Sequence, residues 1–225
     1  MGDHSGIISY SPVELVMSVK AGTKISEINA VLSANNQQLP FDPPDYNGKA
    51  TMGGALACNS SGPGRPWAGS IRDAVLGLKL ISGQGDLLNF GGQVMKNVAG
   101  YDVSRMMAGS MGCLGVITEI SFKVVPKPPL EHTLVADCAA ADAIIEMNTL
   151  SGMAQPLSAA CWMEGKLYLK YSGARSSVEN VLANINSDYS IHSNEFWNSL
   201  NKQELDCFKS DEPLWRFSLK STAAH

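Results

Sequence analysis

The sequence is short of several features that mark common classes of protein. Its apolar runs stay below the roughly 18 residues that a membrane-spanning helix needs, so we expect no span. Basic residues are few, because 17 Lys and Arg against 21 Asp and Glu give a net charge of −4 at pH 7. No basic surface is available to neutralise a phosphate backbone, so we expect no nucleic-acid partner. The first residues also lack the charged and apolar regions of a secretory signal.

Cysteine pairs and metal motifs are absent as well. The chain has five cysteines and four histidines, with no C-x-x-C pair and no spacing typical of a metal site. Scattered cysteines are typical of reduced thiols, so we expect a cytoplasmic protein without a metal. The residues concerned are Cys58, Cys113, Cys138, Cys161, Cys207, His4, His132, His192 and His225.

Glycine is unevenly distributed along the chain. Of the 21 glycines, 18 lie before residue 126. The change coincides with residues 125–129 (VPKPP), which have the composition of a stiff linker. We therefore predict two domains, residues 1–125 and residues 126–225.

Hydrophobic periodicity predicts an α+β fold in both parts. In the first part we expect strands at 7–10, 13–20 and 116–125, a helix at 24–35, and a hairpin of strands 74–81 and 87–90. In the second part we expect strands at 133–138, 157–163, 167–171 and 214–219, with helices at 141–150, from a cap at Ser176 or Ser177 to residue 185, and at 196–208. This order suits a small antiparallel sheet covered by helices.

The most unusual stretch is residues 50–73 (ATMGGALACNSSGPGRPWAGSIRD). Its glycines let backbone approach a ligand closely. Thr51 is placed to cap a short helix whose unpaired N–H groups, with the hydroxyls of Ser60 and Ser61, form a nest for an anionic cofactor. The alternative is a glycine-rich surface loop without a ligand.

Two common phosphate-binding motifs can be excluded in this stretch. The dinucleotide fingerprint G-x-G-x-x-G fails because Trp67 stands at the third glycine and Pro63 lies inside it. The triphosphate loop fails because Ser70 and Ile71 follow Gly69 where Lys and Ser or Thr belong.

Two further segments are rich in glycine and polar residues. Residues 91–109 contain Lys96, Asn97, Tyr101, Asp102 and Arg105, which either line a site or fix the loop; for Asn97 and Asp102 we favour the structural role. A helix beginning near residue 101 or 102 would bury Val103, Met106 and Met107. Residues 109–115 (GSMGCLG) run into a strand, so their backbone can lie against a planar ring; a β-bulge at Gly112 or Gly115 is the alternative.

Three blocks together resemble a known family. ATMGGALACNSSGPGRPWAGSIRDAVLG, GGQVMKNVAGYD and GSMGCLGVITEISFK are similar to the second FAD-binding lobe of the vanillyl-alcohol-oxidase-like flavoproteins, which have a PCMH-type FAD-binding domain. Within that family the blocks look most like the FAD-binding subunits of bacterial glycolate oxidases. The resemblance covers about residues 6–125 and continues more weakly to about residue 220.

The resemblance implies a fold and a cofactor. Residues 1–125 would be the second lobe of the FAD-binding domain, and residues 126–225 part of an antiparallel-sheet cap over the flavin. The family's first lobe has no counterpart here, which implies a chain truncated at both ends. The residues that would contact FAD are Pro44, Asp45, Thr51, Gly53, Gly54, Cys58, Asn59, Ser60, Ser61, Met111, Gly112, Cys113, Leu114, Gly115, Val116 and Ile117.

The resemblance also implies an activity and partners. It implies oxidation of a 2-hydroxy acid, glycolate or D-lactate, to the 2-oxo acid, with electrons passing to a homologous FAD-containing subunit and an iron–sulfur subunit. The complex would be cytoplasmic, or peripheral at the inner face of the membrane through its partners. Arg216 is a candidate clamp for the substrate carboxylate, and no catalytic base is identified. The alternatives are a truncated, non-catalytic scaffold that binds partners but little flavin, and a stand-alone oxidase for another hydroxylated substrate.

Overall fold

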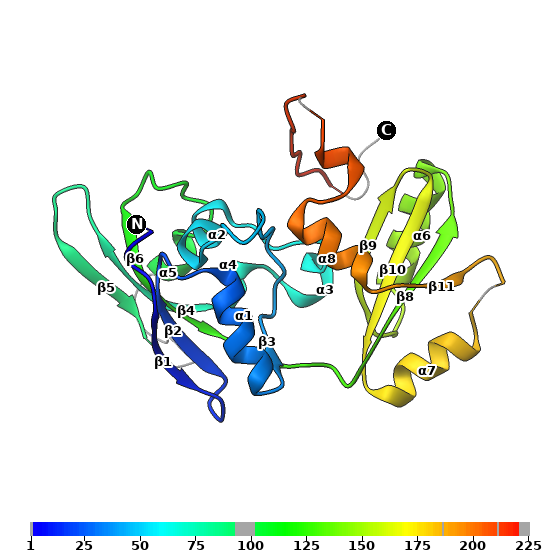
Figure 1. The fold of residues 1–225 in the computed structure, drawn as a ribbon, viewed down its shortest axis with the longest axis horizontal. Coiled ribbons are helices and arrows are strands. Elements are labelled where there is room, and N and C mark those ends of the chain that lie inside the picture. The colour runs from blue at the N-terminus through cyan, green and yellow to red at the C-terminus, as the bar shows by residue number, and fades with distance from the viewer. Residues whose placement is uncertain (1, 93–101, 186, 211, 221–225) are drawn as a thin grey trace. The chain divides into compact units, whose positions relative to one another are not determined.

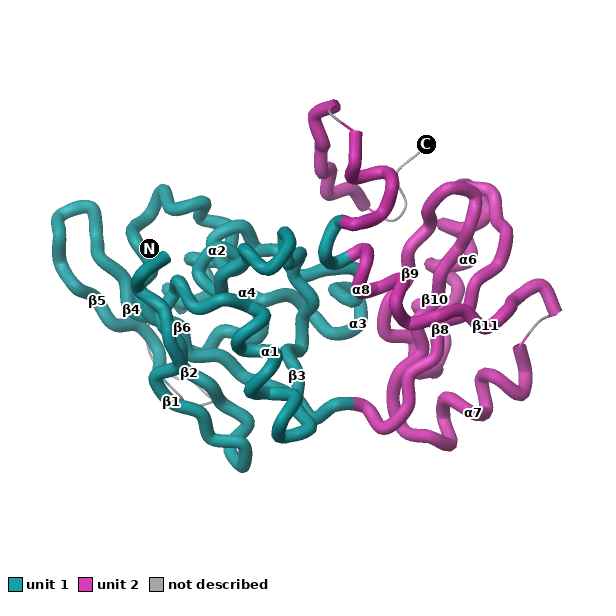
Figure 2. Tube along the Cα trace, in the orientation of Figure 1, with its two compact units in different colours: residues 1–127, 201–203 teal, residues 128–200, 204–225 magenta. Residues whose placement is uncertain are grey.

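The computed structural model describes residues 2–92, 102–185, 187–210 and 212–220. The chain divides into two compact units, shown in Figure 2. Unit 1 comprises residues 1–127 and 201–203, and unit 2 comprises residues 128–200 and 204–225. The expectations for Lys96, Asn97 and Tyr101 lie outside the described residues.

Unit 1 is built on an antiparallel sheet with the strand order β1-β2-β6-β4-β5 (Figure 1). The predicted hairpin is confirmed, because β4 and β5 pair from Ile81 with Leu87 to Gly77 with Gly91. The second predicted strand begins three residues late, since Leu15 has a φ of 56° and Val13 is 92% exposed in a turn. The strands are β1 Ile7–Ser11, β2 Val16–Lys20, β4 Val75–Ile81, β5 Leu87–Gly91 and β6 Val116–Lys123.

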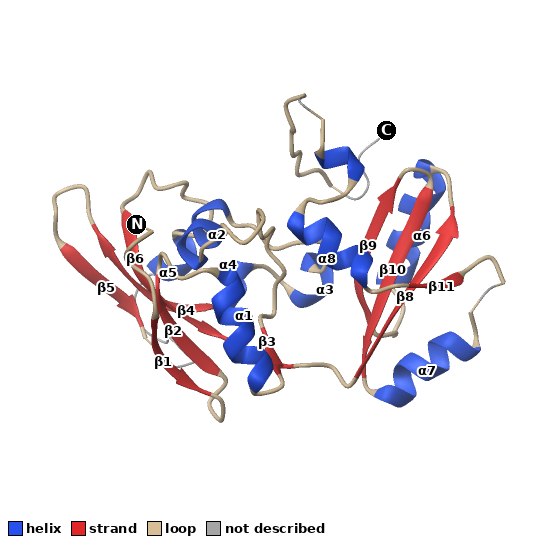
Figure 3. Ribbon diagram, in the orientation of Figure 1, coloured by secondary structure: helices blue, strands red, loops and turns tan. Residues whose placement is uncertain are grey.

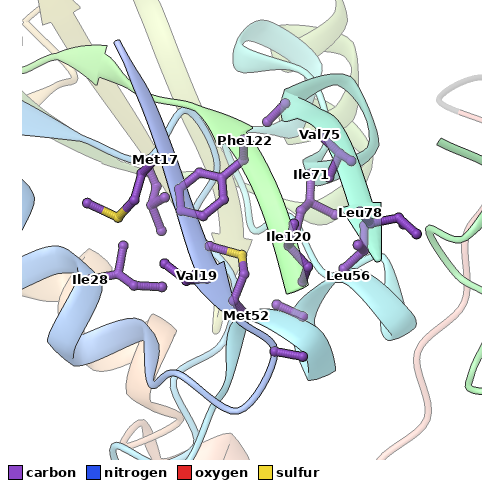
Figure 4. Packing of buried hydrophobic residues seen from close by; sticks show 14 of the residues in the cluster. Met17, Val19, Ile28, Met52, Leu56, Ile71, Val75, Leu78, Ile120 and Phe122 are labelled. Carbon is purple, nitrogen blue, oxygen red and sulfur yellow. The ribbon is translucent and has the colours of Figure 1, made fainter. Parts of the chain in front are cut away.

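Helices cover one face of this sheet (Figure 3). Figure 4 shows Met17, Val19 and Phe122 of the sheet beside Ile28 of α1 and Met52 of α2. All five of these side chains are completely buried, so the core of unit 1 lies between the sheet and its helices. The remaining elements are α1 Ile25–Ala34, α2 Met52–Cys58, α3 Arg65–Ala68, α4 Ile71–Ala74 and α5 Val103–Met106, with the short pair β3 Gln37–Gln38 and β7 Val125–Pro126.

Helix α5 confirms the structural role predicted for Asp102 but not the burial predicted for Met106. Asp102 caps it, because its carboxylate accepts a hydrogen bond from the Arg105 N–H at 3.0 Å and pairs with the Arg105 guanidinium at 3.2 Å. Met107 is buried as predicted, but Met106 is 56% exposed. Ser104 is buried in its place, because its hydroxyl donates to the Phe90 carbonyl of β5.

Unit 2 contains a second antiparallel sheet with the order β11-β8-β10-β9. Tyr168 of β10 stacks on Phe196 of α8 with ring centroids 3.7 Å apart. The next residue, Leu169, points to the opposite face, where it shares a cavity with Val181 of α7. The elements are β8 Leu130–Asp137, β9 Leu157–Met163, β10 Lys166–Gly173, β11 Ser190–His192, α6 Ala140–Ser151, α7 Arg175–Ala183, α8 Glu195–Lys202 and the 3₁₀ turn η1 Asp206–Phe208.

Three boundary predictions in unit 2 are wrong. Helix α7 begins after Ala174, two or three residues earlier than a cap at Ser176 or Ser177 would place it. The helix predicted for 196–208 breaks after Lys202, because Gln203 adopts a φ of 60°. The strand predicted for 214–219 does not form, and Leu214, Trp215, Phe217 and Leu219 are 67–75% exposed. In the described residues, no helix is long and apolar enough to cross a membrane.

Candidate functional site

The start of α2 is held by protein groups rather than left open. The Thr51 hydroxyl accepts from the Gly54 N–H at 3.2 Å, which confirms the predicted cap. The Met52 N–H donates to the Thr23 carbonyl at 2.9 Å, and the Gly53 N–H donates to the Ala21 carbonyl at 2.8 Å. The expectation of unpaired N–H groups is therefore wrong at these positions, because the chain between β2 and α1 supplies the acceptors.

The two glycines of α2 differ in what surrounds them. A Cβ on Gly53 would lie 2.7 Å from the Ala21 Cβ and 2.8 Å from its carbonyl oxygen. Gly53 therefore allows α2 to pack closely against the chain that follows β2. A Cβ on Gly54 would meet only the Thr51 hydroxyl at 3.2 Å, and Gly54 is exposed. Close approach of a ligand stays a prediction for both glycines.

Ser60 and Ser61 follow α2 and are both buried. The Ser61 hydroxyl accepts from the Ile71 N–H at 3.0 Å, so it holds the first residue of α4. The Ser61 carbonyl accepts from the Asp42 N–H at 3.1 Å. Ser61 thus fixes the loop to the fold, and contact of either serine with a cofactor stays a prediction.

The loop of residues 109–115, called the 109–115 loop below, docks on the C-terminal end of α2. The Gly109 N–H donates to the Leu56 carbonyl at 3.0 Å, and the Met111 N–H donates to the Ala57 carbonyl at 2.9 Å. Two segments that the sequence singled out separately are therefore side by side. Cys58 and Cys113 are exposed on them, while Met111 and Leu114 are 69% and 54% exposed.

The 109–115 loop continues into β6, where the exposure of successive side chains differs. Val116 is 47% exposed and pairs with Ile81, whereas Ile117 is buried in the core and pairs with Leu80. A Cβ on Gly115 would lie 2.8 Å from the Ile81 carbonyl oxygen, so this glycine serves strand pairing. A Cβ on Gly112 would meet nothing within 4 Å. Of these residues, Gly112 and Val116 therefore have an open side for a ligand.

The alternative of a β-bulge at Gly112 or Gly115 is wrong, because the irregularity lies further along β6. The register between β4 and β6 shifts between Lys79 and Leu80, which pair with Glu119 and Ile117. The extra residue is therefore Thr118, not Gly112 or Gly115 as considered. The Thr118 hydroxyl donates to the Lys79 carbonyl at 3.1 Å, which stabilises the irregularity.

Asp45 organises the loop that precedes α2. One of its carboxylate oxygens, Oδ2, accepts from the Gly48 N–H at 3.0 Å, and its carbonyl accepts from the Lys49 and Ala50 N–H groups. Its other carboxylate oxygen, Oδ1, is buried without a hydrogen-bond partner. Pro44, beside it, is half-buried.

Three buried side-chain oxygens in the described residues have no hydrogen-bond partner: Asp45 Oδ1, Asn59 Oδ1 and Ser110 Oγ. An unpaired buried polar atom costs about 1–3 kcal/mol, so such atoms point to a missing partner. A Cβ on Gly109 would lie 3.5 Å from the Asn59 Cβ, which places Asn59 beside the residue that precedes Ser110. We call Asn59 and Ser110 with the adjoining end of α2 the junction.

The chemistry of these atoms restricts the partner. Asp45 Oδ1 and Asn59 Oδ1 can only accept hydrogen bonds, so the ligand must bring O–H or N–H donors as well as any phosphate. FAD has such donors in its ribityl and ribose hydroxyls and its ring N–H, so the residues present fit it. Sequence reasoning predicted Asp45 and Asn59 but missed Ser110, whose only signal was a hydroxyl among the glycines of the 109–115 loop.

In unit 2, a polar network that sequence analysis did not predict holds α8. The Trp197 indole N–H donates to the Thr133 hydroxyl at 2.8 Å, and that hydroxyl donates to the Asn194 side-chain oxygen at 2.6 Å. Arg216, the predicted carboxylate clamp, is exposed in a segment without regular structure. Its placement on a strand is wrong, and its contact with substrate stays a prediction. The described residues contain no cluster of three or more potential metal-binding side chains.

A cavity of about 380 Å³ lies between α6, α7 and the sheet of unit 2. Burial raises the pKa of Tyr171 in its wall to about 12. Burial, followed by the charge of Glu146, also raises the pKa of Tyr189. Neither phenol carries a charge near pH 7, and the described residues of the lining include no Lys, Arg or His. A site without a cation is poorly suited to a carboxylate ligand, so this cavity is not where we place a hydroxy-acid substrate.

Comparison with known proteins identifies relatives of the chain. A family model described as an FAD binding domain matches residues 1–91. The chain is 43% identical over 220 residues to glycolate oxidase subunit GlcE of Escherichia coli K12, covering 98% of this chain and 62% of that protein. It is 43% identical over 132 residues to glycolate oxidase subunit GlcD of Bacillus subtilis 168, covering 58% of this chain and 27% of that protein.

The fold is also found in solved structures. An alkyldihydroxyacetonephosphate synthase superposes with a TM-score of 0.68 at 17% identity, covering 90% of this chain and 45% of that one. At that identity the likeness concerns the fold alone. The chain spans less than two thirds of the length of these relatives.

Proposed function

We propose, from the premise that this chain belongs to the PCMH-type FAD-binding flavoproteins, that it is the FAD-binding part of a glycolate-oxidase-type subunit. Its cofactor is FAD. The proposed reaction is oxidation of a small 2-hydroxy acid, glycolate or D-lactate, to the 2-oxo acid. The observation that carries the proposal is the junction, where two segments predicted to contact FAD meet around buried oxygens without protein partners.

The residues at the junction have distinct proposed roles. Asn59 Oδ1 and Ser110 Oγ would bind hydroxyl or N–H groups of the cofactor, which would remove the cost of leaving them unpaired. Met111 and Leu114 would cover apolar surface of the flavin, since both side chains are more than half exposed. When bound, FAD supplies the redox chemistry by accepting a hydride, and the protein orients it and excludes water.

The proposal extends to partners. The relatives that cover this chain include two different glycolate oxidase subunits by name, which supports a protein that works in a multi-subunit enzyme. We propose that electrons pass from this subunit to a homologous FAD-containing subunit and an iron–sulfur subunit. The assembly would be cytoplasmic or peripheral at the inner face of the membrane.

A second candidate is a scaffold subunit that binds partners but little flavin. It is favoured by the start of α2, where the N–H groups of Met52, Gly53 and Gly54 donate to protein oxygens. A phosphate at that position would have to displace these hydrogen bonds, so FAD binding would depend on the contacts at the junction.

Anaerobic reduction distinguishes the two candidates. The chain is loaded with FAD, freed of excess cofactor, and mixed without oxygen with glycolate, D-lactate or acetate. The oxidoreductase proposal predicts loss of the visible flavin band with glycolate or D-lactate but not with acetate, which lacks the hydroxyl group. Flavin that stays oxidised with all three acids, also in the presence of the partner subunits, would support the scaffold.

A further inference from the structure

In unit 2, one cysteine packs against a hydrophobic cluster, and a second cysteine contacts a methionine that packs against the same cluster. Cys161 of β9 packs against the cluster formed by Ala159, Phe196 and Trp197, and so does Met163. The Cys207 thiol of η1 lies 3.6 Å from the Met163 sulfur. Because Cys161 and Met163 are two residues apart on one strand, they point to the same face with about 7 Å between them. The Cys207 sulfur therefore lies against a side chain on the same strand face as Cys161.

The two thiols differ in accessibility. Cys207 is exposed, and Cys161 is half-buried under α8. Burial, with a smaller contribution from the charge of Cys207, raises the pKa of Cys161 to about 11. An oxidant in solution therefore reaches Cys207 more readily than Cys161. Cys161 remains a protonated thiol until Cys207 has reacted.

Leu205 keeps η1 close to this cluster. Its side chain packs against the cluster, and its carbonyl accepts from the Phe208 N–H at 2.9 Å. A disulfide needs Cα atoms about 4.4–6.8 Å apart. The bond therefore requires the single turn η1 to move from Met163 towards Cys161, past the flexible Met163 side chain.

We propose that Cys161 and Cys207 form a reversible disulfide that ties η1 to β9. Hydrogen peroxide first oxidises the Cys207 thiol to a sulfenic acid, as the peroxide O–O bond breaks and one water leaves. The Cys161 sulfur then attacks the Cys207 sulfur, the S–O bond breaks, and a second water leaves. The two thiols lose two electrons and two protons in total, and the peroxide gains both. An added dithiol reverses the reaction by exchange.

The bond would close a loop of 45 intervening residues. A closed loop of that length restricts the unfolded chain and so stabilises unit 2. It would also fasten the segment after α8 across the sheet face that α8 covers.

The test uses the whole 225-residue chain, reduced and then treated with hydrogen peroxide. We expect two of the five thiols to be lost, and a non-reducing digest to yield one peptide pair joining Cys161 to Cys207. The melting temperature of unit 2 should rise by about 10 °C or more and return after dithiothreitol. C207S should abolish the cross-link and the shift, and C161A should do so if C207S alone perturbs folding. C138S is the matched control and should retain both.

Several results would overturn the proposal. One is a cross-link that forms equally in urea, because it would not depend on the folded arrangement. Another is oxidation of Cys207 to a sulfinic acid without any bond to Cys161. Equal pairing of Cys207 with the other cysteines would also contradict it.

Discussion

At the scale of single residues, we expect replacement by alanine to affect stability differently at Ser110 and at Ser61. The Ser110 hydroxyl is buried without a partner, so S110A should leave the stability of the FAD-free chain unchanged or raise it. The Ser61 hydroxyl accepts from the Ile71 N–H, so S61A leaves that donor unpaired and should cost about 1–3 kcal/mol.

Flavin binding separates the two serines further. We expect S110A to weaken FAD binding about fivefold to tenfold, because one hydrogen bond to the cofactor is worth about 1 kcal/mol. Urea unfolding and a flavin fluorescence titration measure the two quantities. If S110A lowers stability as S61A does and leaves FAD binding unchanged, Ser110 has a structural role and the junction is not the site.

The two glycines of α2 form a second matched pair. G53A brings a Cβ to 2.7 Å from the Ala21 side chain and should destabilise unit 1 by about 1–3 kcal/mol. G54A adds a methyl group on an exposed helical position and should be neutral or stabilising by up to about 1 kcal/mol. Thermal unfolding measures both. Weaker FAD binding by G54A at unchanged stability would place the cofactor at Gly54, and equal destabilisation by both variants would refute the packing described for Gly53.

At the scale of elements, we expect the stabilisation of α4 by Asp73 to depend on pH. The Ser70 N–H donates to the Asp73 carboxylate at 2.9 Å, and the Ser70 hydroxyl does the same. The backbone bond first, and then the side-chain bond, lower the pKa of Asp73 below its usual 3.8. Because the pKa is lower in the folded state, this stability is complete above the unfolded pKa and is lost as pH falls through the folded one.

The variant D73N tests this assignment. It should reduce stability at pH 6 and flatten the fall in stability between pH 5 and pH 2, since the titrating group is gone. Denaturant unfolding of both proteins across that range gives the comparison. If stability falls between pH 5 and pH 2 in D73N as it does in the unaltered chain, other carboxylates cause that fall.

Individual helices and strands could be predicted from the sequence, but the strands with which they pair could not. Helix α1 and the β4–β5 hairpin were predicted correctly because each follows from its own periodicity and turn residues. The alternation in residues 214–219 also predicts a strand, yet the described structure has none there, because a strand needs a neighbour to pair with.

The candidate site shows the same limit. The glycine-rich stretch marked the right region, since α2 and the 109–115 loop meet there. The sequence did not reveal that Gly53 and Gly115 face neighbouring backbone, because a glycine at a protein contact and one at a ligand contact read alike. Ser110 was missed because only the folded chain shows its burial.

At the scale of the whole molecule, two units share one chain, and we propose different roles for them. Unit 1 contains the junction and the matched family domain, so it should hold FAD. Unit 2 contains an antiparallel sheet with α8 on one face, and its role as a cap stays a prediction. The central claim is therefore that this chain binds FAD through unit 1.

The visible absorption spectrum of the purified chain tests that claim most directly. FAD is added to the folded 225-residue protein, the excess is removed by gel filtration, and the spectrum of the protein peak is recorded beside that of S110A. We expect a flavin band at near-stoichiometric level in the unaltered chain and a weaker band in S110A. A colourless protein peak whose circular dichroism shows a folded chain would mean that unit 1 does not hold FAD.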